Sequence, residues 1–346
     1  MRFIKPLGLS VALLAPIAAH SQSLTFSDYG PNRGARAAAL ETFGANLAEQ
    51  GIDLTFFWGG SLIGGRGTLQ GLADNVADMG SVVGFFTPAQ LPLYSIGDLP
   101  VENSDTWIGM SAMHELAKTN DALKAEFDAA GVHYVSTYST SPIQLICSDK
   151  VDSLDDMKGL RVRASGPYGD ALTELGAEVV RMSQADVYQA LDSGLLDCNQ
   201  NYYYSIVAYK QYEVANQILA LDWGQNMSFG IFMGKATYEG LSDVAKAAID
   251  AAGDAFIDIY SESLIDGLKS DRAALEGEID GNAIDITELA DADKKTLRDA
   301  SNTQIEAWVA RVGETGGDGK ALLAEYHEII DRKKAELDKQ GYPWAR

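Results

Sequence analysis

Hydrophobic positions in the first half of the chain alternate between short β-type runs and helical spacing. Ala37, Leu40, Phe43 and Leu47 recur at helical spacing, which predicts a helix over 36–50. Strands are predicted over 23–29, 52–58 and 78–83, with a second helix over 67–76. Strands that alternate with helices in this way are typical of a parallel sheet with crossover helices.

A second series of predicted strands follows. These strands are 132–138, 143–147, 160–162, 178–182 and 196–198, and the helices between the last three are 168–175 and 185–191. Two series of strands indicate two sheets, so we expect an α/β protein with two lobes.

One helical pattern is unusually long. Ser242 is a candidate N-cap with Asp243 in the first turn, and the apolar residues that follow meet no proline before Pro343. An uninterrupted helix of about 35 residues would be roughly 50 Å long and would lie across both lobes. Two helices broken near Gly253 or Gly267 are the alternative.

The amino terminus has the pattern of a secretory signal peptide. Arg2 and Lys5 precede an apolar stretch over 7–19, and Ala19 and Ser21 provide small residues for cleavage. The stretch is shorter than the roughly 20 apolar residues of a membrane-spanning helix. We therefore predict that residues 1–21 form a signal peptide and that the mature protein is periplasmic.

The charge balance excludes one class of partner. Lys plus Arg number 27 against 49 Asp plus Glu, which gives a net charge of −22 at pH 7. Binding to nucleic acid depends on a basic face that neutralises phosphates, so no nucleic-acid partner is expected. Cys147 and Cys198 are the only cysteines. Export permits a disulfide between them, and the sequence leaves open whether they form one.

Sequence motifs of common enzymes are missing. The chain has no His-Glu-x-x-His pair and no Gly-x-Ser-x-Gly. The glycine-rich segment 59–67 follows a predicted strand but fits neither a dinucleotide-binding nor a Walker pattern, so we interpret it as a sharp turn between strand and helix. Contact of its free N–H groups with a small ligand is the alternative.

Two segments carry a resemblance to a known family. They are Lys158-Gly159-Leu160-Arg161-Val162-Arg163 and the run Val187-Tyr188-Gln189-Ala190-Leu191-Asp192-Ser193-Gly194-Leu195-Leu196-Asp197, with weaker support from Gly80 and Leu99-Pro100. This order resembles the periplasmic solute-binding proteins of tripartite ATP-independent periplasmic (TRAP) transporters, of the dicarboxylate-binding (DctP) type, over most of the mature chain.

The resemblance implies a two-lobed periplasmic binding protein fold with crossing hinge strands and a long helix spanning both lobes. Residues 22–141 and 229–270 would form lobe I, and residues 142–228 and 271–346 would form lobe II with the C-terminal helices. The family implies a cleft that closes on a small organic anion and delivery of that anion to a membrane permease.

The resemblance places the anion-clamping arginine at Arg163. A guanidinium presents a rigid fork that matches a carboxylate, and side-chain alternation puts Arg161 and Arg163 on the strand face opposite Val162. Hydrogen bonds are expected from amide side chains and apolar walls from aromatic ones. The remaining predicted ligand-binding residues are Gln144, Gln200, Asn201, Gln225, Trp58, Phe85, Tyr203 and Trp223.

No metal or cofactor is expected. A branch of the family that binds 2-oxo acids or lactate through a metal ion has acidic ligands where this chain carries Gln200 and Gln225, and neutral amides lack the charge that a hard cation requires. We predict a non-enzymatic, monomeric binding protein for a small carboxylate. The alternatives are an exported hydrolase or lyase acting on a small organic acid, and a sensor that presents its ligand state to a receptor.

Overall fold

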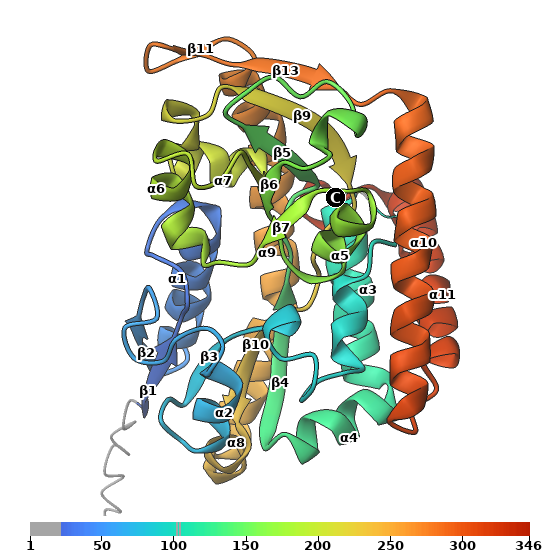
Figure 1. The fold of residues 1–346 in the computed structure, drawn as a ribbon. Helices are drawn as coiled ribbons and strands as arrows, with labels where there is room; N and C mark the ends of the chain where they lie inside the picture. The colour runs from blue at the N-terminus through green and yellow to red at the C-terminus, as the bar shows by residue number, and fades with distance from the viewer. Residues whose placement is uncertain (1–21, 102, 104) are drawn as a thin grey trace, which may run out of the picture.

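The computed structural model describes residues 22–101, 103 and 105–346, and the predicted signal peptide, residues 1–21, lies outside the described residues. The described chain forms two α/β lobes, each built on its own sheet, one above the other in Figure 1. Among the described helices, none combines the length and the apolar character needed to cross a membrane.

Lobe I is built on a five-stranded sheet of order β2-β1-β3-β10-β4. Strand β1 pairs in parallel with β2 and β3, whereas β10 lies antiparallel between β3 and β4. The strands are β1 (Gln22–Ser27), β2 (Ile52–Phe57), β3 (Met79–Val83), β4 (Val132–Tyr138) and β10 (Phe229–Gly234), and the helices of this lobe are α1 (Gly34–Ala48), α2 (Thr68–Ala73), α3 (Thr106–Thr119), α4 (Asp121–Ala129) and α8 (Lys235–Gly240).

Lobe II is built on a six-stranded sheet of order β13-β9-β5-β8-β6-β7. Strand β6 is parallel to β7 and β8, and β5 is antiparallel to β8 and β9. The strands are β5 (Ile143–Cys147), β6 (Arg161–Arg163), β7 (Glu178–Val180), β8 (Cys198–Asn201), β9 (Gln217–Trp223) and β13 (Asp285–Glu288), with helices α5 (Gly166–Glu174), α6 (Val187–Asp192) and α7 (Tyr203–Ala208) and the small hairpin β11 (Glu278–Ile279) and β12 (Asn282–Ala283).

The chain passes between the lobes at two crossing segments and along one helix. One crossing runs from β4 to β5 and the other from β9 to β10. Helix α9 (Asp243–Leu275) is continuous, begins at the N-cap Ser242 and lies against both lobes (Figure 1). A Cβ atom on Gly253 would lie 2.3 Å from the backbone oxygen of Val135, so this glycine allows α9 to approach β4 closely rather than breaking the helix.

The two C-terminal helices connect the lobes a further time. Helix α10 (Asp291–Glu314) starts in the core of lobe II with Leu297 and ends in the core of lobe I with Trp308. Helix α11 (Gly319–Gln340) packs on α3, and its Tyr326 is fully buried in the lobe I core. The expected boundary, with all of 271–346 in lobe II, therefore differs from the structure, because lobe I buries the apolar face of α11.

A disulfide joins Cys147 of β5 to Cys198 of β8, a pairing that the sequence left open. The two residues face each other in the antiparallel register, with their Cα atoms 4.1 Å apart, and both are fully buried. The neighbouring strand β6 aligns Val162 with Cys198, so the bridge lies beside the strand that ends in Arg163.

Candidate ligand-binding site

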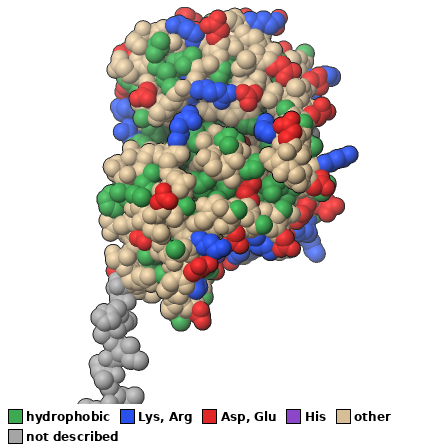
Figure 2. Space-filling model, turned by 60° about the horizontal axis from the view of Figure 1, so that its bottom comes forward, with side chains coloured by type: hydrophobic (Ala, Val, Ile, Leu, Met, Phe, Trp, Pro, Cys, Tyr) green, Lys and Arg blue, Asp and Glu red, His purple; other side chains and the backbone are tan. Residues whose placement is uncertain are grey.

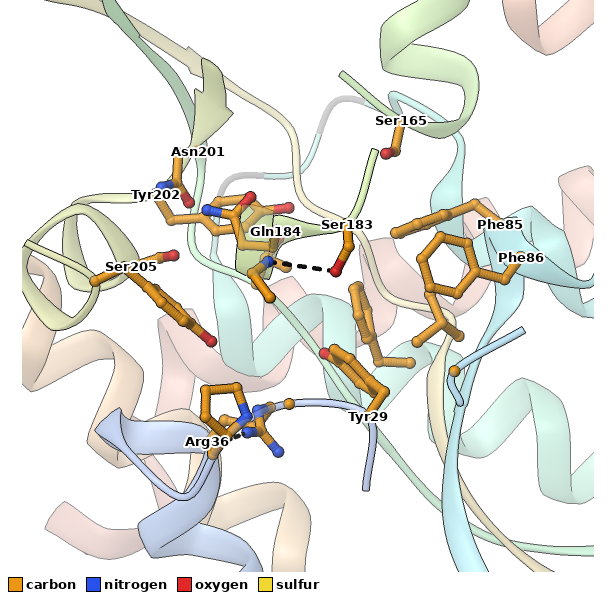
Figure 3. Close-up of a pocket in the computed structure, with 18 of the residues that line it drawn as sticks. Tyr29, Arg36, Phe85, Phe86, Ser165, Ser183, Gln184, Asn201, Tyr202 and Ser205 are labelled. Atoms are coloured by element: carbon orange, nitrogen blue, oxygen red, sulfur yellow. Dashed lines mark hydrogen bonds between the residues drawn. The ribbon is translucent and has the colours of Figure 1, made fainter. Parts of the chain in front are cut away.

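A cavity of about 740 Å³ lies between the two lobes. Lobe I lines it with residues that follow β1 and β3, and lobe II lines it with residues at and after the ends of β6, β7 and β8 (Figure 3). Carboxyl ends of strands are the usual place for ligands in open α/β sheets. Five arginines and no Asp, Glu or Lys occur among the described residues that line it, so the cavity suits an anion.

Arg163, the last residue of β6, lines this cavity and is 9% exposed. Its Nε donates to the backbone oxygen of Met182 at 3.2 Å, and within the described chain its guanidinium makes no other hydrogen bond and no ion pair. Burial lowers the pKa of Arg163 from its usual value. The two terminal nitrogens of a buried cation are thus left for an acceptor inside the cavity.

Arg161 has a different environment although it shares the strand face with Arg163. Its Nε donates to Oδ2 of Asp197 at 2.9 Å, and its Nη1 donates to the backbone oxygen of Gly194 at 2.8 Å. This arginine is partly exposed and is absent from the cavity lining. The structure therefore separates the two arginines into one with a carboxylate partner and one without.

Arg36 of α1 is the second buried arginine of the cavity, and Asp28 neutralises it. Asp28 accepts hydrogen bonds from this guanidinium, from Ser81 Oγ at 2.6 Å and from the backbone N–H of Gly30 at 2.7 Å. Burial acts to lower the pKa of Arg36, but the charge of Asp28, together with the nearby tyrosines, raises this pKa above its usual value. The pair leaves no net charge at this point of the wall.

Aromatic rings form much of the remaining lining. Phe85 meets the rings of Phe86 and Phe229 edge to face at centroid distances of 4.8 and 5.5 Å. Tyr202 and Tyr204 stack at 5.6 Å in the wall on the lobe II side. Such rings provide a large apolar contact area with few rotatable bonds, so the body of a ligand would lie among aromatic faces.

Polar side chains supply a few directional contacts. Gln184 Nε2 is buried and has no hydrogen-bond partner in the described part of the chain, and the residue lines the cavity (Figure 3). Asn201 also lines it, and its Nδ2 donates to Gln211 Oε1 at 2.6 Å. A buried donor without a partner costs free energy, so Gln184 is suited to donate to a bound acceptor.

Three of the nine predicted site residues, Arg163, Asn201 and Phe85, line the cavity. The other six lie outside its lining, and several have partners elsewhere. Gln144 Nε2 donates to Asp222, and Gln200 Oε1 accepts from the backbone N–H of Ser165. The others are Trp58, stacked on Phe56, Tyr203 in the lobe II core, Trp223, which donates to Ser301 Oγ, and Gln225, which donates to Thr106 Oγ1.

The cavity also brings together Tyr29, Arg36, Tyr138 and Gln184, which are not among the residues predicted from the sequence. Tyr29 lies two residues after the end of β1, and Tyr138 is the last residue of β4, so the rule that strand ends face the cleft could have selected them. Arg36 lies inside α1, and nothing in the local pattern distinguishes it from a surface residue. Among the described residues, no group of three or more His, Cys, Asp or Glu side chains is arranged to hold a metal ion.

Comparison with known proteins agrees with this architecture. The C4-dicarboxylate-binding periplasmic protein DctP of Rhodobacter capsulatus is 22% identical to this chain over 327 residues, which are 92% of this chain and 96% of that one. A second curated relative is also 22% identical, over 302 residues. The Bordetella pertussis extracytoplasmic solute receptor DctP6, which binds pyroglutamic acid, superposes with a TM-score of 0.79 at 17% identity, covering 89% of this chain and 100% of that one.

A TRAP periplasmic solute-binding protein of Bordetella bronchiseptica with bound mandelate superposes equally well, with a TM-score of 0.79 at 20% identity over 90% of this chain and 99% of that one. Residues 26–311 match the family described as bacterial extracellular solute-binding protein, family 7 (DctP). This match spans most of the chain and both sheets, so the protein belongs to bacterial extracellular solute-binding protein family 7.

Proposed function

We propose that this protein captures a small organic acid with a single carboxylate and an apolar or aromatic body, and delivers it to a TRAP membrane permease. The observation that carries the proposal is Arg163, which is buried in the cavity wall without a carboxylate partner among the described residues. A buried cation of this kind is costly unless an anion compensates it, and a bound carboxylate would supply that charge.

The charges of the cavity favour one carboxylate over two. Of the two buried arginines, Arg36 is already paired with Asp28, whereas Arg163 has no such partner. The second carboxylate of a dicarboxylate would lose its hydration in the cavity. No other unpaired buried arginine of the described lining would compensate for the free energy of that loss. The aromatic lining provides an apolar surface for the rest of the ligand instead.

The family and the predicted signal peptide support the proposed cellular role. Family 7 proteins are extracellular solute-binding proteins, and residues 1–21 have the pattern of an export signal. A monomeric periplasmic protein that holds its ligand between two lobes and releases it unchanged to a permease is consistent with these observations. Binding is favoured over hydrolysis or elimination because the described lining has no His, Cys, Asp, Glu or Lys beside its hydroxyl groups, and its titratable members are arginines and tyrosines.

Two measurements test the proposal together. Native mass spectrometry of the purified protein should detect a bound acid of low mass, and a thermal-shift screen should then compare benzoate, mandelate and pyroglutamate with the dicarboxylate succinate. A ligand at 100 times its dissociation constant stabilises the folded state by about 2.7 kcal/mol, which a melting scan resolves. Stabilisation by succinate alone would contradict the single-carboxylate proposal, and chemical conversion of the bound acid would support the enzymatic alternative.

A further inference from the structure

The strongly acidic protein has an unusual concentration of arginine at the opening of its cavity. Arg33, Arg66 and Arg181 line the cavity in addition to the buried Arg36 and Arg163. Arg33 and Arg66 are exposed, and Figure 2 shows basic and hydrophobic side chains gathered along the middle of one face of the molecule. The chain as a whole carries a net charge of −22, so the sign of this arginine cluster is opposite to that of the net charge.

Two of the three arginines at the opening, Arg33 and Arg66, are not neutralised by a carboxylate of any described residue. The third, Arg181, forms an ion pair with Asp170. Arg33 and Arg66 form no ion pair in the described part of the chain, and each is held instead over an aromatic ring. The Arg33 guanidinium lies 5.6 Å from the ring centre of Tyr209, and that of Arg66 lies 4.8 Å from the ring centre of Phe86. A ring holds a guanidinium in place without neutralising it.

The net negative charge of the protein opposes the approach of an anion to the cavity. A field of net negative sign repels an organic anion that comes within the screening length of the surface, which is about 10 Å at 0.1 M salt. Fixed positive charges at the opening of a cleft reverse that repulsion locally, and they raise both the local anion concentration and the association rate.

We propose that Arg33 and Arg66 act as an electrostatic entrance that attracts anions to the cavity and excludes cations, separately from the carboxylate contact of Arg163. The inference rests on the proposed function in that the ligand is an anion. It assigns to the two exposed arginines the selection of ligands by charge and the rate of capture, and it assigns to Arg163 the retention of the ligand.

A test that needs no knowledge of the natural ligand uses a thiol placed in the cavity. Both native cysteines are joined in the disulfide, so Ser183→Cys, in the cavity lining, introduces a single reactive thiol. Its alkylation rate with iodoacetate, an anion, is divided by its rate with iodoacetamide, which is neutral. The division cancels changes in thiol exposure and ionisation and leaves the electrostatic effect on the anionic reagent.

Arg33→Gln and Arg66→Gln, each in the Ser183→Cys background, should lower this ratio about twofold at low ionic strength, as expected for one charge at roughly 10 Å in water. The double variant should lower it about fourfold, and 0.5 M salt should remove most of the difference. Arg33→Lys and Arg66→Lys should keep the ratio of the parent, because the charge remains. The matched control is Arg311→Gln, which removes an exposed positive charge from α10 outside the cavity lining and should leave the ratio unchanged.

An unchanged ratio in the double variant, an equal decrease in Arg311→Gln, or a decrease in the lysine variants would overturn the inference. The measurement is independent of binding at Arg163, because alkylation needs only the approach of the reagent. Failure of the proposed function would therefore appear as an absence of carboxylate binding while the arginine variants still lower the ratio. Failure of the entrance would appear as an unchanged ratio in the arginine variants while carboxylate binding remains.

Discussion

Replacing Arg163 separates its role in binding from any role in stability. In the ligand-free protein this side chain is 9% exposed and gives only its Nε–H to a protein acceptor in the described residues. Arg163→Ala removes the guanidinium, and Arg163→Lys keeps the charge but loses the planar fork. Arg161→Ala is the matched control, since Arg161 shares the strand but is held by Asp197 outside the cavity.

The expected magnitude follows from the burial of the contact. Loss of one partner of a buried, hydrogen-bonded charge pair costs about 2–5 kcal/mol, which corresponds to an increase in Kd on the order of 30-fold to 4,000-fold. Arg163→Lys should fall between wild type and Arg163→Ala, because a point charge remains without the two parallel hydrogen bonds. Arg161→Ala should change Kd by no more than about twofold.

The assay is calorimetric titration with the acid identified by the thermal-shift screen, combined with unfolding of each variant without ligand. A buried charge without a partner destabilises the ligand-free fold, so Arg163→Ala should melt no lower than wild type while losing affinity. That combination excludes misfolding as the reason for the loss. Equal affinities of Arg163→Ala and Arg161→Ala, in proteins that remain folded, would refute the assignment of the clamp.

Three further predictions concern metal, motion and pH. Affinity for the acid should survive EDTA, because the described lining of the cavity contains no Asp or Glu to hold a divalent cation, and Gln200 and Gln225 are neutral; abolition by EDTA with recovery on adding Ca²⁺ would contradict this. Small-angle scattering should show a smaller radius of gyration at saturating ligand if the lobes close about the crossing segments, and an equal radius with confirmed binding would count against closure. Burial raises the pKa of Asp98, which accepts a hydrogen bond from Ser228 Oγ at the crossing after β9, to about 7. When a carboxyl binds its proton more tightly in the folded than in the unfolded state, the folded protein loses stability as pH rises from about 4 to about 7. Asp98→Asn should therefore be less costly at pH 8 than at pH 5, by up to about 3 kcal/mol in denaturant melts, and an equal cost at both values would contradict the assignment.

Local pattern was sufficient for the elements whose signal lies within the element itself. Strands β4 and β5 occupy the predicted residues, and α9 is continuous from the predicted N-cap Ser242. Strand β6 ends at Arg163, one residue beyond the predicted end, and that residue reaches the cavity. In these segments, alternation, helical spacing and capping each reflect burial against a neighbouring element.

Other features depend on contacts distant in sequence. Strand β10 is buried throughout, so it shows no alternation of polar and apolar residues, and its place between β3 and β4 depends on the crossing from lobe II. Three consecutive tyrosines show the same difficulty at the site. Tyr202 and Tyr204 line the cavity while Tyr203 is buried in the lobe II core, because the start of α7 turns successive side chains in different directions.

A crystal structure of the protein with its bound acid tests the central claim most directly. The account predicts density for the acid in the cavity between the lobes, with its carboxylate oxygens about 2.7–2.9 Å from the terminal nitrogens of Arg163 and its body against the aromatic wall. A carboxylate bound elsewhere, or one in the cavity that makes no contact with Arg163, would contradict it.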